Sequence, residues 1–128
     1  MTGYTPPTQG LDNSYSALVF IGQHAMAGAP NGILSHSYGF EIQNMWVNNK
    51  LVGEIGGRTM LAGYFGVPVI MLSRDAAACD ELHDLVPSAE CAEVKKGLSR
   101  TAGIGLSHAA ARDPIREKSQ RAMSDWYG

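Results

Sequence analysis

The amino-acid sequence predicts an α/β fold, with a layered and mostly parallel sheet, flanking helices and an inserted β-hairpin. Two continuous apolar runs, ALVFI at 17–21 and VPVIML at 67–72, have the length and composition of strands in a parallel sheet. Segments with helical spacing of apolar residues separate and follow these runs, which is the order that parallel strands require. The 128 residues suit one domain with a core of its own.

The first expected strand, residues 16–22, is a short apolar run that we expect to be buried on both faces of the sheet. The loop that follows, from Gly22 to Phe40, consists largely of small residues and carries His24 and His36. Ligands of open α/β sheets gather beyond the carboxyl ends of the strands. This loop therefore begins where a site is expected.

A β-hairpin is expected between residues 40 and 54. Apolar and polar residues alternate from Phe40 onward, and the dipeptide Asn48-Asn49 suits a turn that needs positive φ angles. The alternation then slips by one position, which predicts a bulge near Asn44.

A helix over about 53–65 is indicated by apolar residues at helical spacings and by Gly66, which suits the position after a helix end. The second apolar run comes next. Asp75 is then a suitable N-cap for a helix over 76–86, and Pro87 would stop that helix.

The last third of the sequence predicts a short strand near 92–94 and a final helix. We place the start of this helix at Asp113-Pro114, because aspartate suits an N-cap and proline suits the first turn. Beyond this start, one apolar stripe is formed by Ile115, Ala122, Met123 and Trp126.

Composition excludes some classes of partner. A net charge of −2, with mixed charges over 95–121, argues against nucleic-acid binding. No apolar run approaches the roughly 20 residues that span a bilayer, and the first residues lack the order of a signal peptide. We therefore expect a cytoplasmic protein with no membrane partner.

Cys79 and Cys91 lack the spacing of a metal site or a redox motif, and we expect two reduced thiols rather than a disulfide.

Three side chains are candidate site residues. His24 directly follows the first strand and suits a metal ligand or a general base, or else a loop histidine bonded to backbone. His36 lies between two serines that could fix its ring for acid–base work, or it is a plain polar loop residue. Glu54 lies where the helix dipole favours an ionised carboxylate, and a helix-start glutamate without further role is the simpler interpretation. His83 and His108 are expected on the surface.

A family resemblance is carried by four blocks of sequence: GLDNSYSALVFIGQHAMAG, GILSHSYGF, WVNNKLVGEIGGRTMLAGYFGVPVIMLSRDAAACDE and VKKGLSRTAGIGLS. The motif SHS, followed by N-x-x-x-VGE-x-G, is the most specific part. From about Gly10 to Met123 the chain resembles the zinc-dependent D-aminopeptidases, the family typified by the enzyme of the bacterial dipeptide-transport operon.

The resemblance implies an enzyme that hydrolyses short peptides with an amino-terminal D-amino acid by a two-zinc mechanism. It implies that His24 and Glu54 are ligands of one zinc, and that His36 is the catalytic histidine beside the metals. It also implies a homo-oligomer. Two-metal sites activate a water and polarise the scissile carbonyl.

The family pattern also includes an Asp-x-Glu pair on an earlier strand, another histidine and a carboxy-terminal part, none of which matches this sequence. We therefore expect residues 1–128 to be the central part of a D-aminopeptidase-like catalytic domain, with one partial zinc site. The alternative is a non-catalytic α/β binding or assembly domain that retains the fold only.

Overall fold

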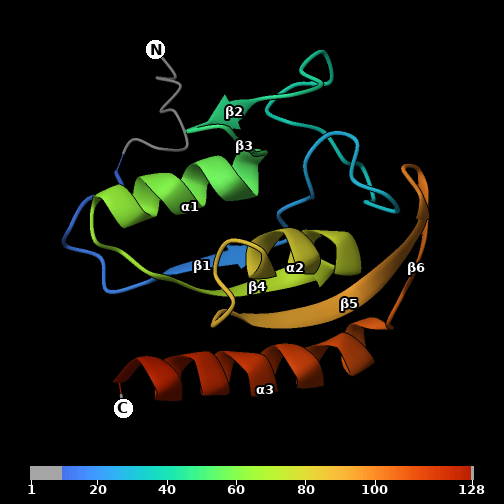
Figure 1. Cartoon of the computed structure of the whole chain (residues 1–128). Helices are drawn as coiled ribbons and strands as arrows, with labels where there is room; N and C mark the ends of the chain where they lie inside the picture. The colour runs from blue at the N-terminus through green and yellow to red at the C-terminus, as the bar shows by residue number, and fades with distance from the viewer. Residues whose placement is uncertain (1–9, 128) are drawn as a thin grey trace, which may run out of the picture.

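The computed structural model describes residues 10–127 and contains a four-stranded sheet with the strand order β1-β4-β5-β6 (Figure 1). The strands are β1 (Leu18–Ile21), β4 (Val69–Asp75), β5 (Glu90–Ser99) and β6 (Ala102–Gly105). β1, β4 and β5 run parallel, and β6 returns antiparallel to β5. The expected α/β class with a mostly parallel sheet is confirmed.

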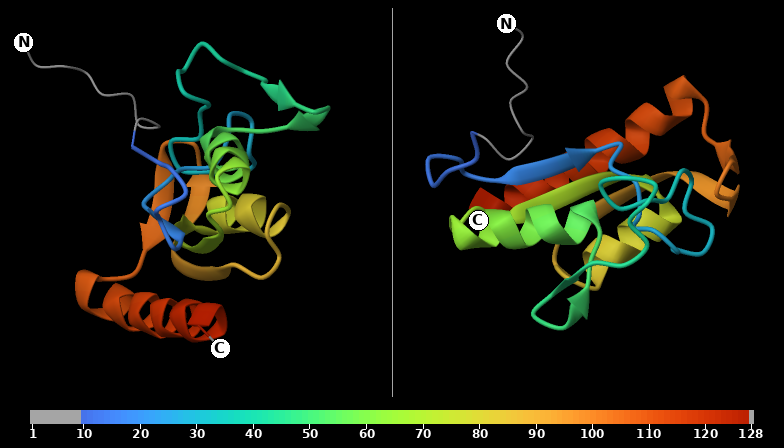
Figure 2. Two further views of the ribbon diagram at one scale, coloured as in Figure 1. Left: turned by 90° about the vertical axis from the view of Figure 1, so that its left-hand side faces the viewer. Right: turned by 90° about the horizontal axis from the view of Figure 1, so that it is seen from above.

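Helices form the outer layers of the sheet. α1 (Glu54–Tyr64) and α2 (Ala76–His83) lie together over one face, and α3 (His108–Tyr127) covers the other (Figures 1 and 2). A small hairpin of β2 (Trp46–Val47) and β3 (Lys50–Leu51) stands apart from the main sheet. No helix among residues 10–127 has the length and apolarity to cross a membrane.

The core lies mainly between the sheet and the pair of helices α1 and α2, where Ile55 and Leu72 are fully buried. A smaller cluster joins Met71 of β4 to Ala122 of α3 on the opposite face. Burying each large aliphatic side chain contributes about 1.5–3 kcal/mol. Both helical layers are therefore fixed to the sheet by packing.

Local signals set the ends of two helices as the sequence predicts. Gly66 has a φ of +73°, and the Val67 N–H donates a 2.9 Å hydrogen bond back into the last turn of α1. Asp75 caps α2, because its Oδ1 accepts the Ala78 N–H at 3.1 Å. Its Oδ2 also accepts the Ile33 N–H at 3.2 Å. The cap of α2 thus also holds the loop that carries the two histidines.

The expectation that the first strand is buried on both faces is wrong. Among the described residues 10–127, β1 lies at the edge of the sheet with Phe20 in the core, whereas Val19 is 42% and Ile21 70% exposed on its other face. α3 packs mainly against β4 and β5 and leaves those two side chains uncovered. A continuous apolar run does not tell a central strand from an edge strand.

The hairpin is shorter than expected. Residues before β2 are irregular, so the arm expected from Phe40 and the bulge expected near Asn44 are not formed. Phe40 instead contacts the His36 ring, with ring centroids 4.6 Å apart. The turn itself is confirmed, since Asn48 and Asn49 have φ angles of 50° and 64°.

Helix and strand limits also differ toward the carboxyl end. β5 is a ten-residue strand, longer than the short strand expected near 92–94, and α2 ends at His83. α3 begins at His108, and the Ala110 N–H donates to the Ser107 Oγ at 3.2 Å, so Pro114 lies inside the helix. The helix start expected at Asp113-Pro114 is therefore wrong, and the interior proline removes one helical hydrogen bond.

Candidate metal centre

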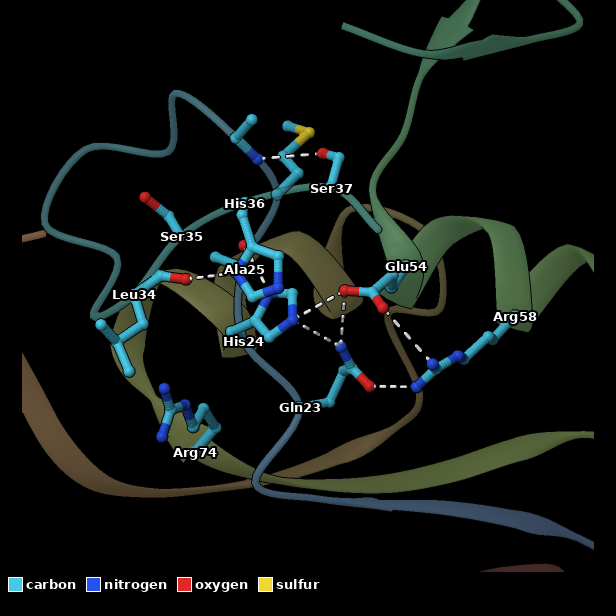
Figure 3. Close-up of polar contacts among 12 residues, drawn as sticks. Gln23, His24, Ala25, Leu34, Ser35, His36, Ser37, Glu54, Arg58 and Arg74 are labelled. Atoms are coloured by element: carbon cyan, nitrogen blue, oxygen red, sulfur yellow. Dashed lines mark hydrogen bonds and ion pairs between the residues drawn. The ribbon is translucent and has the colours of Figure 1, made fainter. Parts of the chain in front are cut away.

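His24 lies just beyond the carboxyl end of β1, at the sheet edge where a site was expected (Figure 3). Gly22, with a φ of +73°, turns the chain out of the strand while its N–H still bonds to the Ser73 carbonyl of β4 at 2.8 Å. The ring of His24 points toward the start of α1 (Figure 3). Its Nδ1 lies 3.1 Å from the carbonyl oxygen of Ala25.

His36 comes from the middle of the same loop. The Ser37 Oγ accepts the Ala27 N–H at 3.1 Å, which joins the two arms of the loop. The His36 Nδ1 lies 2.6 Å from the carbonyl oxygen of Leu34. Leu34 has a φ of +56°, a left-handed conformation that costs about 1–2 kcal/mol for a residue with a side chain. The fold therefore maintains strain at the residue that orients His36.

Glu54 is the first residue of α1, and its side chain is only 10% exposed. Its Oε2 lies 2.7 Å from the Nε2 of His24 and accepts a 3.3 Å hydrogen bond from the Gln23 side chain. Arg58, one turn later in the helix, lies 3.4 Å from the Oε1 and also bonds to Gln23. The carboxylate is thus held by one amide and one guanidinium, facing the histidine (Figure 3).

The three candidate residues form one cluster, because one ligand atom from each of His24, His36 and Glu54 lies within 4.8 Å of the other two. The imidazole rings stack, with centroids 3.6 Å apart and planes inclined by 25°. The structure therefore brings together all three residues that the sequence singled out, while His83 and His108 lie exposed elsewhere.

The hydrogen bonds of the two rings assign their protons. Carbonyl oxygens accept but do not donate, so the Nδ1 of each ring carries a hydrogen. The Nε2 of His36 keeps its lone pair in the neutral ring. The Nε2 of His24 lies 2.7 Å from the Glu54 Oε2, a contact that needs a proton or a metal ion between the two atoms. Burial lowers the pKa of His24, although the Ala25 carbonyl and the Glu54 charge oppose this shift. Neutral imidazole and carboxylate are the forms that bind zinc, and a backbone partner at Nδ1 is usual for a metal-ligating histidine.

Residues that support the cluster were missed by sequence reasoning. Gln23 directly precedes His24, and Arg58 lies four positions after Glu54 on the same helix. Their spacing from these candidate ligands could therefore have indicated both residues. Glu81 comes from α2, and its Oε2 accepts the Met26 N–H at 2.7 Å. Nothing local in the sequence connects Glu81 to the histidine loop, because only the tertiary fold brings α2 to that loop.

The sequence model of a protein family described as D-aminopeptidase matches residues 4–127 of the chain. The chain belongs to the D-aminopeptidase family. The chain is 38% identical over 117 residues to a protein from Bacillus subtilis strain 168 that is named D-aminopeptidase. The match covers 91% of the chain and 42% of that relative.

A solved structure agrees with the sequence match. The family member superimposes with a TM-score of 0.88 and 37% identity on a structure described as Zn-dependent D-aminopeptidase DppA from Bacillus subtilis, a self-compartmentalizing protease. The similarity covers 91% of this chain and 42% of that one. The chain thus spans less than half the length of the relatives that it matches.

Proposed function

We propose that residues 1–128 form the central part of the catalytic domain of a zinc-dependent D-aminopeptidase. One observation carries this proposal: the cluster of His24, His36 and Glu54 at the carboxyl edge of the sheet. Membership of the family and the zinc dependence stated for the solved relative support it.

The donor set fits zinc. His24 and Glu54 offer an imidazole nitrogen and a carboxylate oxygen from two rigid elements, and both are already oriented by other side chains or backbone. A zinc ion held there would act as a Lewis acid and lower the pKa of a bound water. Gln23 and Arg58 would keep the carboxylate directed at the metal.

We assign His36 to acid–base work beside the metal. Its Nδ1 is fixed by the Leu34 carbonyl, so its Nε2 is the atom that can accept and return a proton. Its ring lines the pocket next to the cluster, where a peptide bond has access to it. The stack against His24 limits its rotation.

The cluster is a partial site under this proposal. A catalytic zinc normally has three protein ligands and a water, and two of these ligands are assigned here. We place the bridging carboxylate and the remaining ligands of a two-zinc centre outside residues 1–128, in keeping with relatives that are more than twice as long.

Short peptides with an amino-terminal D-amino acid are the proposed substrates, and a homo-oligomer in the cytoplasm is the proposed state. The name of the relative supports the substrate class, and the description of the solved structure as self-compartmentalizing supports assembly. Light scattering at increasing protein concentration measures the assembly, and a chain that stays monomeric would contradict it.

Calorimetric titration with zinc tests the site, together with hydrolysis assays on D-alanyl-D-alanine and L-alanyl-L-alanine. We expect His24→Ala and Glu54→Gln each to weaken zinc binding by at least about tenfold. Loss of a residue that only hydrogen-bonds to a metal ligand already weakens binding by about that factor, and loss of the ligand itself should weaken it more. The exposed His108→Ala is the matched control and should bind as the natural chain does.

Two results would reject the proposal. Zinc affinity that is the same in His24→Ala and His108→Ala would show that the cluster is not the metal site. Zinc bound at the cluster without hydrolysis of either dipeptide, even when the chain is joined to the rest of a longer protein, would favour the non-catalytic alternative.

A further inference from the structure

A pocket of about 290 Å³ lies beside the metal cluster and contains an arginine that the proposed chemistry does not use. Residues 27–29, all of them small, line it together with His36, Phe40 and Arg100. This volume is near the lower limit for small-molecule sites and suits one end of a small ligand.

Arg100 is held in place by three contacts, although it lies at the turn between β5 and β6. Its Nε donates to the Ser35 carbonyl at 3.1 Å, and its Cζ lies 5.0 Å from the centroid of the Phe40 ring. Its backbone carbonyl accepts the Leu34 N–H at 2.7 Å. Ordering the side chain beforehand reduces the entropy lost when a ligand binds.

The two terminal nitrogens of this guanidinium are not used within the described part of the chain. No carboxylate among residues 10–127 forms an ion pair with Arg100. The hydrogen bond from its side chain to the Ser35 carbonyl uses the Nε and leaves both terminal nitrogens available. Four other arginines, Arg58, Arg74, Arg116 and Arg121, are each paired with a carboxylate, whereas Arg112 also forms no ion pair among residues 10–127 and is exposed on α3 away from the pocket. Arginine presents a planar fork of donors that matches a carboxylate in two parallel hydrogen bonds.

We infer that Arg100 binds the C-terminal carboxylate of short peptides whose scissile bond lies at the metal cluster; the inference rests on the proposed function. Arg100 would then select the substrate by its free carboxylate and by its length. Residues 27–29 leave room for the side chain next to that carboxylate.

The spacing limits the length of such a peptide. The Phe40 ring centroid lies 4.6 Å from that of His36 and 5.0 Å from the Arg100 Cζ. The imidazole and the guanidinium are therefore at most about 10 Å apart, roughly the span of three extended residues. The ion pair itself takes up part of this span, so at most one or two residues fit between the scissile bond and Arg100, which limits the substrates to dipeptides and tripeptides.

Binding to the metal-free chain tests the inference without relying on catalysis. Two-dimensional NMR titrations with D-alanyl-D-alanine and with D-alanyl-D-alaninamide compare a free carboxylate with a neutral amide of the same shape. We expect the acid to bind at least about tenfold more tightly than the amide, because hydrogen bonds to charged groups are strong, and we expect Arg100→Gln to abolish this difference.

Hydrolysis gives a second readout once the chain is joined to the rest of a longer protein and loaded with zinc. Arg100→Gln should raise KM for the dipeptide acid by about tenfold or more while changing hydrolysis of the amide little. Arg100→Lys should restore part of the affinity, because it keeps the charge but not the fork. Arg112→Gln, at an exposed position on α3, is the matched control.

Equal binding of acid and amide by the natural chain, or no measurable binding of the acid, would overturn the inference. Equal losses on both substrates in Arg100→Gln would also overturn it, since they would indicate that Arg100 only positions the loop. Failure of the proposed function would look different: the acid would still bind in preference to the amide, but zinc would produce no hydrolysis even when the chain is joined to the rest of a longer protein.

Discussion

The Nε2 of His24 lies 2.7 Å from the Oε2 of Glu54, and the side-chain amide of Gln23 bonds to the same oxygen at 3.3 Å. Gln23 carries no charge, so replacing it tests orientation of the carboxylate without changing the net charge near the metal. We expect Gln23→Ala to weaken zinc binding about 10- to 100-fold, the usual loss for an outer partner of a ligand. Calorimetry measures this change, and the exposed Gln120→Ala should show none.

His36 and His24 are expected to differ in what they contribute. In the active zinc-loaded protein, His36→Ala should lower kcat by about 10²–10⁴-fold and leave the zinc content nearly unchanged. His24→Ala should lower both kcat and the zinc content. Metal analysis alongside peptide hydrolysis separates the two roles. Loss of zinc from His36→Ala would show that His36 is a third zinc ligand. This role is compatible with the structure, because a ligand atom of His36 lies within 4.8 Å of those of His24 and Glu54.

Glu81 connects α2 to the histidine loop through the Met26 N–H. Glu81→Ala leaves this half-buried donor without its partner, so we expect a loss of about 1–3 kcal/mol in the free energy of unfolding. Glu81→Gln keeps an acceptor and should lose less. Chemical denaturation of the two variants measures the difference, and equal losses would mean that the hydrogen bond contributes nothing.

The pH dependence of stability gives Glu81 a second test. Burial raises its pKa above the ordinary value of 4.5, although nearby backbone amides oppose this shift. A carboxyl with a raised folded-state pKa takes up protons on folding, so its contribution to stability is full below about pH 4.5 and falls as the pH rises. Glutamine does not ionise, so Glu81→Gln does not lose stability in this way as the pH rises. The stability of that variant, relative to the natural chain, should therefore increase from about pH 4 to pH 7.

Gly53 allows the histidine loop to approach the start of α1. A Cβ at this position would lie 2.8 Å from the Met26 Cα, so Gly53→Ala must displace the loop. We expect it to lower the free energy of unfolding by about 1–3 kcal/mol and to weaken zinc binding. Gly63→Ala is the control in the same helix, because no atom lies within 4 Å of its added Cβ and the change should stabilise by about 0.5–1 kcal/mol.

The sequence indicated the cluster because each of its residues lies at a recognisable place in the fold. His24 follows an apolar strand, and Glu54 begins a helix whose end is marked by Gly66. The carboxyl ends of parallel strands and the amino ends of their helices meet at one edge, so these two residues could be expected to meet. The role of each residue came from the family resemblance and stays a prediction.

Features that depend on distant contacts could not be predicted in the same way. Arg100 reaches the histidine loop because the β5–β6 hairpin is long, whereas only a short strand was expected near 92–94. The exposure of Ile21 depends on which strand forms the sheet edge, and strand order is not encoded in one apolar run. Asp113-Pro114 has the residues of a helix start, but α3 begins earlier, where the Ser107 Oγ accepts the Ala110 N–H.

The parallel pairing of β1 with β4 decides when the metal cluster can assemble as the chain folds. Leu18 pairs with Val69, so this contact closes a long loop that includes the histidine loop, the hairpin and α1. Such non-local pairings form slowly, and a metal site built across them is absent from early folding species. Zinc should therefore slow unfolding of the finished domain while leaving its rate of folding almost unchanged.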